Sequence, residues 1–195
     1  MTSESATEAV PTKPFRILTV CTGNICRSPI AERLLQAELD ERHPGQFVVQ
    51  SAGTGALVGY PIDPQMEGLV RALGGNPDNF YARQLSPETL KEQDLVLTLT
   101  REHRGRVVEM APAMLKKTFT LREFARIVSS IESDGLAHGA NRWRAWIPKA
   151  LRKRSAQKMH TEDDVIDPYK QDNHVFNVVA KQISHCVSTL VTFTD

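Results

Sequence analysis

The chain has 195 residues, 41% of them hydrophobic, which is enough for one good core and too few for two comfortable domains. Its 24 basic and 23 acidic residues nearly balance, so the overall charge gives no reason to expect nucleic-acid binding. No segment approaches the roughly 20 apolar residues that span a bilayer, and the first residues lack the apolar stretch of a secretory signal. We therefore expect a cytoplasmic protein.

The domain organisation follows from local composition. Residues 1–14 are polar, contain two prolines and show no periodicity, which predicts a flexible N-terminal tail. Residues 15–195 are expected to form a single domain. Two of the three cysteines, Cys21 and Cys26, lie five positions apart, a spacing that suits reduced thiols better than the disulfide framework of a secreted protein.

Strand and helix patterns alternate along this domain. Short runs of β-branched and aliphatic residues predict strands at 15–20, 47–51, 94–99 and 117–121. Helical patterns follow Pro29 and Ser86-Pro87 and occupy 66–73, 101–110, 121–131 and 174–192, with Thr100 as an expected cap. Alternating units of this kind predict an α/β fold, a parallel sheet with helices on both faces. In such sheets ligands bind outside the carboxyl ends of the strands.

The segment from Cys21 to Pro29 directly follows the first predicted strand and leads into a helix. A loop that wraps toward a helix N-terminus can aim successive backbone N–H groups at one point, where the helix dipole adds positive potential. This arrangement predicts a phosphate-binding loop. Its expected phosphate-binding residues are Thr22, Gly23, Asn24, Ile25, Cys26, Arg27 and Ser28.

Two residues of this loop carry the expected chemistry. The field that attracts phosphate also favours the thiolate of Cys21, and a thiolate is the nucleophilic form of cysteine. Arg27 has the planar fork that makes two parallel bonds to phosphate oxygens. Asn24 and Ser28 can brace the loop through side-chain hydrogen bonds, and Gly23 allows close backbone approach.

The nine-residue string CTGNICRSP closely resembles the phosphate-binding loop of the low-molecular-weight protein tyrosine phosphatases, bacterial type. The resemblance continues through Ser51-Ala52-Gly53-Thr54, Ala82-Arg83-Gln84-Leu85 and Asp167-Pro168-Tyr169 and covers most of residues 15–193. It implies a four-stranded sheet of flavodoxin-like order 2-1-3-4 and a hydrolase with a phosphocysteine intermediate. It also implies a phosphotyrosine-containing protein as substrate, no cofactor or metal, and a monomer or weak dimer.

The resemblance makes Asp167 the general acid that protonates the leaving oxygen, a function that contributes about 10² to 10⁴ in rate. Asp-Pro is also a common turn opener, which is the structural alternative for Asp167. The neighbouring Asp163 and Asp164 are interpreted as solvated loop charges. Their positions, unlike that of Asp167, lack the following Pro-Tyr.

The remaining cysteines and the histidines have plain interpretations. In this family the second loop cysteine, here Cys26, can trap an oxidised nucleophile as a reversible disulfide, and a small buried residue is the equal alternative. Cys186 falls on the apolar face of the last helix and is expected in the core. The six histidines are scattered and predicted to lie at the surface: His43, His103, His138, His160, His174 and His185.

Three positions bear on substrate choice. Many relatives place a histidine that braces the loop where this chain has Phe80, so the brace must be weaker or rebuilt. The loop after Thr54 carries Leu57 instead of the aromatic residue that often forms one wall of the phosphotyrosine slot, which leaves Tyr169 as the aromatic wall. Ile25 favours phosphotyrosine, because relatives that act on phosphoarginine tend to have threonine there. Ser51, Leu57 and Tyr169 are therefore expected supporting or specificity residues.

Residues 132–161 form a basic insert before the Asp-Pro segment. Between Asn141 and Lys158 it contains seven cations and no acid, with Trp143 and Trp146 on another helical face. We favour a surface helix packed by its tryptophans, which Pro148 should kink or split. The alternative is a docking surface near the active site for an acidic protein segment or, less favoured, an anionic membrane.

Other functions on the same fold remain as alternatives. A thioredoxin-coupled arsenate reductase needs shuttle cysteines roughly 70 to 80 residues after the nucleophile, by resemblance to that enzyme class, and no cysteine lies between Cys26 and Cys186. A phosphoarginine phosphatase would share the loop. A weakly active module that only binds phospho-ligands would lack the nucleophile or the acid, and both are present here.

Overall fold

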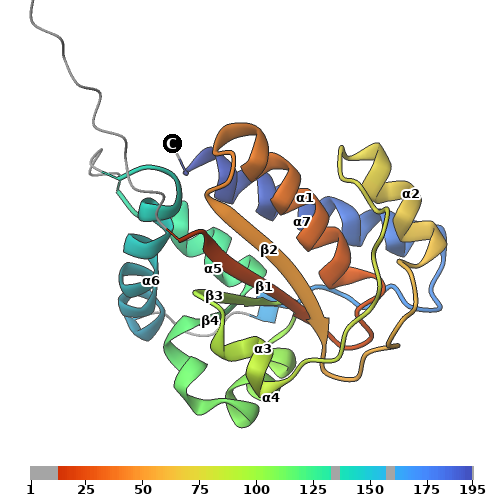
Figure 1. Ribbon diagram of the computed structural model, residues 1–195, viewed down its shortest axis with the longest axis horizontal. Coiled ribbons are helices and arrows are strands. Elements are labelled where there is room, and N and C mark those ends of the chain that lie inside the picture. Colours follow the sequence, from red (N-terminus) through yellow and green to blue (C-terminus); the bar gives the residue numbers. More distant parts are fainter. Residues whose placement is uncertain (1–12, 133–136, 157–160, 195) are drawn as a thin grey trace, which may run out of the picture.

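Four parallel strands form the centre of the molecule (Figure 1). They are β1 (Phe15–Cys21), β2 (Phe47–Gly53), β3 (Leu95–Thr98) and β4 (Thr118–Thr120), paired in the order β2-β1-β3-β4. The expected order and all four strands are confirmed. The computed structural model describes residues 13–132, 137–156 and 161–194. Most of the tail expected at 1–14 lies outside these residues.

Helices cover both faces of this sheet, because successive strand residues point to opposite sides. On one side α1 (Arg27–Arg42), α5 (Leu121–Val128) and α7 (Asn173–Thr192) pack over the larger core, with α2 (Pro64–Ala72) beside them. On the other side α3 (Pro87–Lys91) and α4 (Arg101–Met110) cover a smaller core that includes Leu18, Val20 and Val96. Within the described part of the chain, no helix has the length and apolar character needed to cross a bilayer.

The register places the phosphate-binding loop at the carboxyl edge of the sheet. Cys21, the last residue of β1, lies opposite Gly53, and Val20 lies opposite Thr98 of β3. Helix α1 begins at Arg27, two residues earlier than the expected start at Pro29. Proline is compatible with the first helical turn, where its missing N–H has no intrahelical acceptor. Arg27 is therefore held at a helix N-terminus.

Within the described part of the basic insert lies the helix α6 (Gly139–Ala156). Trp143 is fully buried, with its ring 6.0 Å from that of Phe15, 5.6 Å from that of Phe47 and 5.9 Å from that of Phe124. The expected packing by tryptophans is confirmed. Of the expected kink or split at Pro148, the split is wrong, because α6 is continuous and apolar residues on both sides of Pro148 pack into one core.

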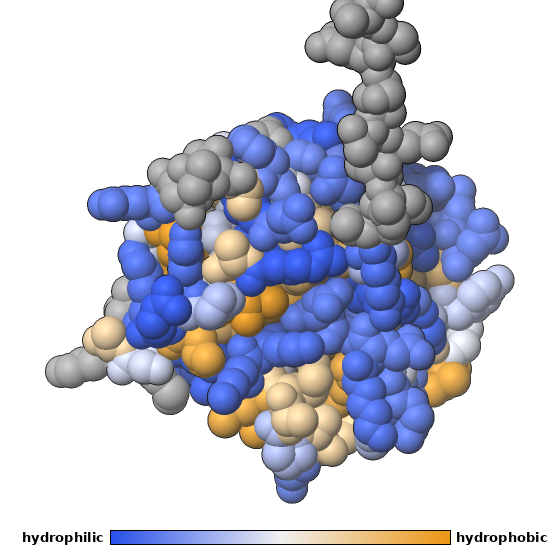
Figure 2. Space-filling model, turned by 60° about the vertical axis from the view of Figure 1, so that its left-hand side comes forward, coloured by the Kyte–Doolittle hydropathy of each residue, from blue (hydrophilic) through white to orange (hydrophobic). Residues whose placement is uncertain are grey.

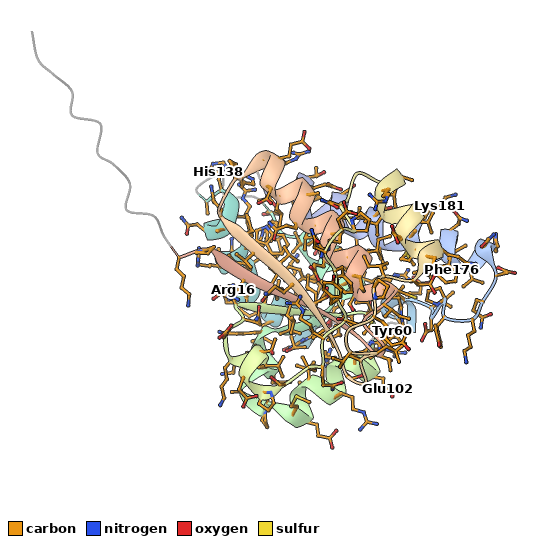
Figure 3. All side chains as sticks on the ribbon, turned by 45° about the vertical axis from the view of Figure 1, so that its right-hand side comes forward. Arg16, Tyr60, Glu102, His138, Phe176 and Lys181 are labelled. Atoms are coloured by element: carbon orange, nitrogen blue, oxygen red, sulfur yellow. The ribbon has the colours of Figure 1, made fainter. Side chains whose placement is uncertain are left out.

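Helix α6 lies at the opposite end of the sheet from Cys21. Phe15 and Phe47, which Trp143 contacts, are the first residues of β1 and β2. In Figure 3 His138, just before α6, lies far from Tyr60 and Glu102, which are near the carboxyl ends of the strands. The expected position of this docking surface near the active site is wrong, because α6 packs against the amino ends of the strands. Docking of an acidic protein segment or an anionic membrane on α6 stays a prediction.

Several cations of α6 hold the helix in place. Arg154 donates to the carbonyl oxygen of Thr118 at 2.7 Å and stacks over the ring of Phe119, 4.4 Å from its centroid. Lys153 donates to the carbonyl oxygen of Ser130. Figure 2 shows this largely hydrophilic side of the molecule. The Arg154 bond satisfies a carbonyl group of the edge strand β4, where open backbone groups invite pairing with another strand.

Replacing Trp143 by alanine tests this packing. The change removes a fully buried ring and its 2.9 Å hydrogen bond to Thr194 Oγ1, so we expect the free energy of unfolding to fall by about 3–5 kcal/mol. Urea denaturation measures it. Arg152→Ala, at an exposed position of α6, is the control and should change stability by less than about 0.5 kcal/mol. Equal small effects would contradict the packing role of Trp143.

Candidate active site

The backbone of the phosphate-binding loop is turned with its carbonyl groups outward. Four carbonyl oxygens accept hydrogen bonds of 2.9–3.1 Å from N–H groups of the next connection, in the pairs Cys21–Thr54, Thr22–Gly55, Gly23–Leu57 and Ile25–Asp63. Among the described residues, none accepts a bond from the N–H groups of residues 22–26. These N–H groups are thus available to an anion at the centre of the loop.

The end of β2 must approach the loop closely to make these bonds. A side chain at Gly53 would clash with the carbonyl oxygen of Thr22 and press against Ala56. Only glycine fits where two backbones approach in this way. Gly53 also donates a backbone hydrogen bond to Arg83 and accepts one from Leu85, both of 2.8 Å. These bonds tie the segment 83–85 to the end of β2 and, through it, to the phosphate-binding loop.

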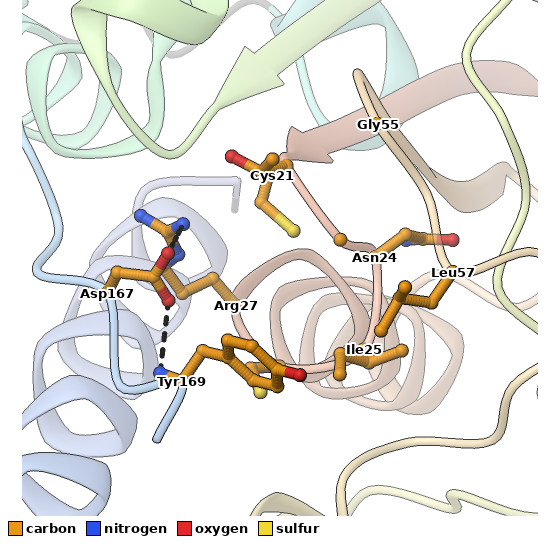
Figure 4. Close-up of a pocket in the computed structure, with 11 residues that line it drawn as sticks. Cys21, Asn24, Ile25, Arg27, Gly55, Leu57, Asp167 and Tyr169 are labelled. Carbon is orange, nitrogen blue, oxygen red and sulfur yellow. Dashed lines mark hydrogen bonds and ion pairs between the residues drawn. The ribbon is translucent and has the colours of Figure 1, made fainter. Parts of the chain in front are cut away.

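Cys21 lies at the base of a pocket of about 190 Å³. Its side chain is 2% exposed and its Sγ is 2.9 Å from Ser28 Oγ. A hydroxyl at this distance can donate to a thiolate and stabilise its charge. The pocket (Figure 4) is lined by Cys21, Thr22, Gly23, Asn24, Ile25, Cys26, Arg27, Gly55, Leu57, Asp167 and Tyr169. The expected Ser28 and Ser51 lie behind this lining.

Asn24 fixes the shape of the loop. Its φ of 55° is the left-handed conformation, which costs free energy in residues other than glycine. The side-chain amide donates to Ser28 Oγ at 2.9 Å and to Ser51 Oγ at 2.8 Å, and its oxygen accepts from the backbone N–H of Arg83 at 2.8 Å. These three bonds offset the conformational cost and bring the expected bracing residues together.

A buried carboxylate completes the brace. Ser51 Oγ donates to Glu32 Oε2 at 2.5 Å, and the guanidinium groups of Arg33 and Arg83 lie 3.5 and 3.7 Å from the Glu32 carboxylate. Burial raises the pKa of Glu32 against the lowering effect of the Ser51 bond and the two arginines. Phe80 is buried with Arg33 5.4 Å from its ring centroid. The brace that the family resemblance would assign to a histidine at position 80 is therefore rebuilt around Glu32, a residue that the sequence pattern did not reveal.

Arg27 and Asp167 meet across the pocket. Arg27, almost fully buried, donates from Nη2 to Asp167 Oδ2 at 2.7 Å and from Nη1 to the carbonyl oxygen of Val165 at 3.2 Å. The other oxygen of Asp167 accepts from the backbone N–H of Tyr169 at 3.1 Å, as Figure 4 shows. The Asp167 side chain remains 53% exposed. It can thus be reached from solvent and from the pocket.

Asp163 and Asp164 are not solvated loop charges, so that prediction is wrong. Asp163 is buried and accepts two bonds of 3.2–3.3 Å from Arg126 of α5. Asp164 accepts from the backbone and guanidinium of Arg101 in α4. Partial burial would raise the pKa of Asp164, and the bonds from Arg101 hold it below its usual value. The two pairs clamp the Asp167 loop between α4 and α5.

His103 is a further residue of the site and its predicted surface position is wrong. It is 5% exposed, with Nε2 2.9 Å from Thr22 Oγ1 and Nδ1 2.9 Å from Thr100 Oγ1. Burial, aided by the nearby Arg27 charge, lowers the pKa of His103 to about 4. The other described histidines are half-buried (His43) or exposed (His138, His174 and His185), and His160 lies outside the described residues.

The remaining thiols are buried. Cys26 lines the pocket, and burial together with the Asp63 charge raises the pKa of its thiol. Cys186 lies on the buried face of α7, in the core as expected, and burial raises its pKa to about 11. Within residues 13–132, 137–156 and 161–194, no three His, Cys, Asp or Glu side chains are placed to bind a metal ion together.

Comparison with known proteins identifies the family. A family model described as low molecular weight phosphotyrosine protein phosphatase matches residues 16–135. This is more than half of the chain. The chain belongs to the low molecular weight protein tyrosine phosphatase family. The match includes the phosphate-binding loop and the residues that brace it, and it ends before Asp167.

Two bacterial phosphatases are similar to about half of the chain. The phosphatase Wzb of Escherichia coli K12 is 45% identical over 101 residues and that of Salmonella typhi 43% identical over 102 residues. Each alignment covers 52% of this chain and 65% of the relative's length. The chain thus spans less than two thirds of these relatives.

Solved structures of the family align over most of the chain. The low molecular weight phosphatase of T. tengcongensis, at 27% identity and a TM-score of 0.67, covers 91% of this chain and 98% of its own. The YwlE arginine phosphatase of Geobacillus stearothermophilus, at 27% identity and a TM-score of 0.66, covers 92% of each.

Replacing Asn24 by alanine tests the loop brace. The variant keeps a left-handed residue without its three side-chain bonds, so we expect a loss of about 1–3 kcal/mol in stability and a fall of about 100-fold in kcat/KM for an aryl phosphate. Denaturation and steady-state kinetics measure these. Asn177→Ala, on an exposed face of α7, is the control. Unchanged kinetics in the Asn24 variant would contradict the brace.

The low pKa of His103 predicts a loss of stability in mild acid. Its folded pKa of about 4 lies below the unfolded value of 6.5, so the unfolded chain binds the proton first and stability falls as the pH drops through this window. Between pH 7 and pH 5, His103→Gln should remove about 2 kcal/mol of this fall. Urea denaturation of the wild type, His103→Gln and the control His185→Asn at both pH values measures the fall in the free energy of unfolding. The same fall in all three proteins would contradict the low pKa of His103.

Proposed function

We propose that the protein is a protein tyrosine phosphatase that hydrolyses phosphate monoesters through a phosphocysteine intermediate. One observation carries the proposal: the N–H groups of residues 22–26, which have no acceptor within the described part of the chain, belong to residues that line one pocket with Cys21, Arg27 and Asp167. This combination offers a nucleophile, an anion cradle and an acid at one point. Family membership supports it.

In the first proposed step the thiolate of Cys21 attacks phosphorus in line with the ester oxygen. A sulfur–phosphorus bond forms and the phosphorus–oxygen bond to the leaving group breaks. Arg27 and the loop N–H groups hold the three equatorial oxygens, where negative charge is spread in the transition state. Asp167 donates its proton to the leaving oxygen, which departs as a neutral phenol.

In the second proposed step water attacks the phosphocysteine. Asp167, now ionised, takes a proton from the water as the oxygen–phosphorus bond forms. The sulfur–phosphorus bond breaks and Cys21 returns as thiolate, which Ser28 Oγ at 2.9 Å stabilises. Inorganic phosphate leaves as a dianion, the same charge that the phosphoryl group carried in the monoester. The cycle requires no cofactor.

The walls of the pocket favour an aromatic leaving group. Tyr169 and Leu57 line it on opposite sides of Ile25 (Figure 4), and all three present apolar surface to a phenyl ring. We propose phosphotyrosine in a protein as the substrate and the cytoplasm as the location, with a monomer or weak dimer as the working state. Phosphoarginine is the second candidate, because a structural neighbour is described as an arginine phosphatase.

Substitution of the nucleophile and the acid tests the mechanism. Cys21→Ser should abolish hydrolysis of para-nitrophenyl phosphate, and Asp167→Asn should lower kcat by about 10² to 10⁴. The deficit of Asp167→Asn should shrink for aryl phosphates whose phenol is a better leaving group, because these need less protonation. Residual rates equal to that of the wild type in Cys21→Ser would rule out the phosphocysteine.

A substrate panel tests the specificity. Wild type should hydrolyse a phosphotyrosine peptide with a kcat/KM at least about tenfold above matched phosphoarginine and phosphoserine peptides. Ile25→Thr should move the ratio toward phosphoarginine, and Leu57→Ala should weaken phosphotyrosine alone. Preference of the wild type for phosphoarginine would replace tyrosine by arginine in the proposal and leave the phosphocysteine chemistry in place.

A further inference from the structure

We infer that His103 is a positioning residue that holds the nucleophile loop through Thr22, acting as a neutral hydrogen-bonding link between the start of α4 and the residue next to Cys21. The inference deepens the proposed function and rests on it for its kinetic part. His103 does not itself line the pocket and has no described contact with Cys21; its contact with the pocket is made through Thr22. Its effect on the reaction must therefore pass through Thr22.

The link consists of one contact at each ring nitrogen of His103. Nε2 lies 2.9 Å from Thr22 Oγ1 and Nδ1 lies 2.9 Å from Thr100 Oγ1. Thr100 caps α4, because its Oγ1 accepts from the backbone N–H of His103 at 3.2 Å. The His103 residue is 5% exposed, so its ring nitrogens have little access to water.

The hydrogen-bonding roles follow from the cap. Since Thr100 Oγ1 already accepts from the backbone, its single hydroxyl proton is best used toward Nδ1. Nε2 then carries the ring proton and donates it to Thr22 Oγ1. This tautomer is neutral, in keeping with the charges that act on the ring: Arg27 opposes protonation, and Asp167 and Asp164 favour it less strongly. A neutral ring adds direction without adding charge beside the phosphate site.

Thr22 is the residue whose position matters for this link. It follows Cys21, its carbonyl oxygen is held by Gly55, and its N–H is the first of those available to phosphate. Its side chain is exposed and has no other hydrogen-bond partner within the described part of the chain. Without His103, the first peptide of the loop would be fixed on one side only, and the N–H group of Thr22, next to Cys21 in the sequence, would lose orientation.

A purely structural role does not require this geometry. A buried residue at the first turn of α4 could be apolar, as Val107 is one turn further on. Burying a polar ring costs free energy unless both nitrogens are bonded. One of the two bonds leads to an exposed side chain in the phosphate-binding loop, where it contributes little to the core.

Two substitutions separate the two bonds. Asparagine carries its polar atoms near the position of Nδ1 and can keep the contact to Thr100, whereas glutamine reaches the position of Nε2 and can keep the contact to Thr22. We expect His103→Asn to lower kcat/KM for an aryl phosphate by about tenfold or more, and His103→Gln to restore most of it. Thermal denaturation of both variants shows whether they are equally folded.

A second readout does not depend on hydrolysis. The rate of Cys21 alkylation by iodoacetate against pH reports the thiolate, and its midpoint should shift upward by about half a pH unit or more in His103→Asn and less in His103→Gln. Thr22→Val should give the same shift, and the double variant with His103→Asn should add nothing to it. His185→Asn, the same change on the exposed side of α7, is the control.

The outcomes are distinct. Loss in His103→Asn with recovery in His103→Gln, and coupling to Thr22, support the positioning role. Unchanged kinetics and midpoint in both variants overturn it, as does loss of activity that follows thermal stability with no shift in the midpoint. If the wild type hydrolyses no phosphate ester, the proposed function fails, and the alkylation comparison alone then decides the role of His103.

Discussion

The constraint on which the site depends is the set of backbone bonds between the phosphate-binding loop and the connection after β2. Each bond takes up a loop carbonyl oxygen, and a peptide whose carbonyl is fixed on one side presents its N–H on the other. The cradle is thus made by main chain, and side chains only need to keep it in place. Gly53 is required because these backbones approach so closely, and the parallel pairing of β1 with β2 supplies the register.

Polar side chains then lock this backbone from behind. Asn24, Ser28, Ser51 and Glu32 form one connected set that ends at the arginines near the surface. Buried networks of this kind are rigid when every member is satisfied and costly when one is not. The loop of Asp167 is held separately, by ion pairs of its neighbours with α4 and α5. The nucleophile and the acid therefore come from two supports, which Arg27 joins through its bonds to Val165 and Asp167.

Local sequence patterns predicted most of the elements and the phosphate-binding loop. They could not predict contacts between residues that are far apart in the sequence. Strand positions, the cap at Thr100 and the loop from Cys21 to Ser28 follow from periodicity and a contiguous motif. The burial of His103 could not be inferred, because a histidine among charged residues is equally typical of a surface helix, and its partner Thr22 is 81 positions away. Glu32 left a weaker signal: it lies four residues after Ser28 and hence on the same face of α1. The end of the sheet covered by α6 depended on aromatic packing that no single segment reveals.

The ion pair between Arg27 and Asp167 has a consequence for the resting protein. A guanidinium buried to this extent would be costly alone, and the carboxylate at 2.7 Å compensates it. The protein thereby carries an internal competitor for its own anion site. A phosphate group that binds Arg27 must first displace the Asp167 carboxylate. The observed affinity for phosphate is therefore the intrinsic affinity multiplied by the fraction of molecules in which this ion pair is open. When product phosphate leaves, the Asp167 carboxylate takes its place beside Arg27. We therefore expect the free enzyme to bind inorganic phosphate weakly.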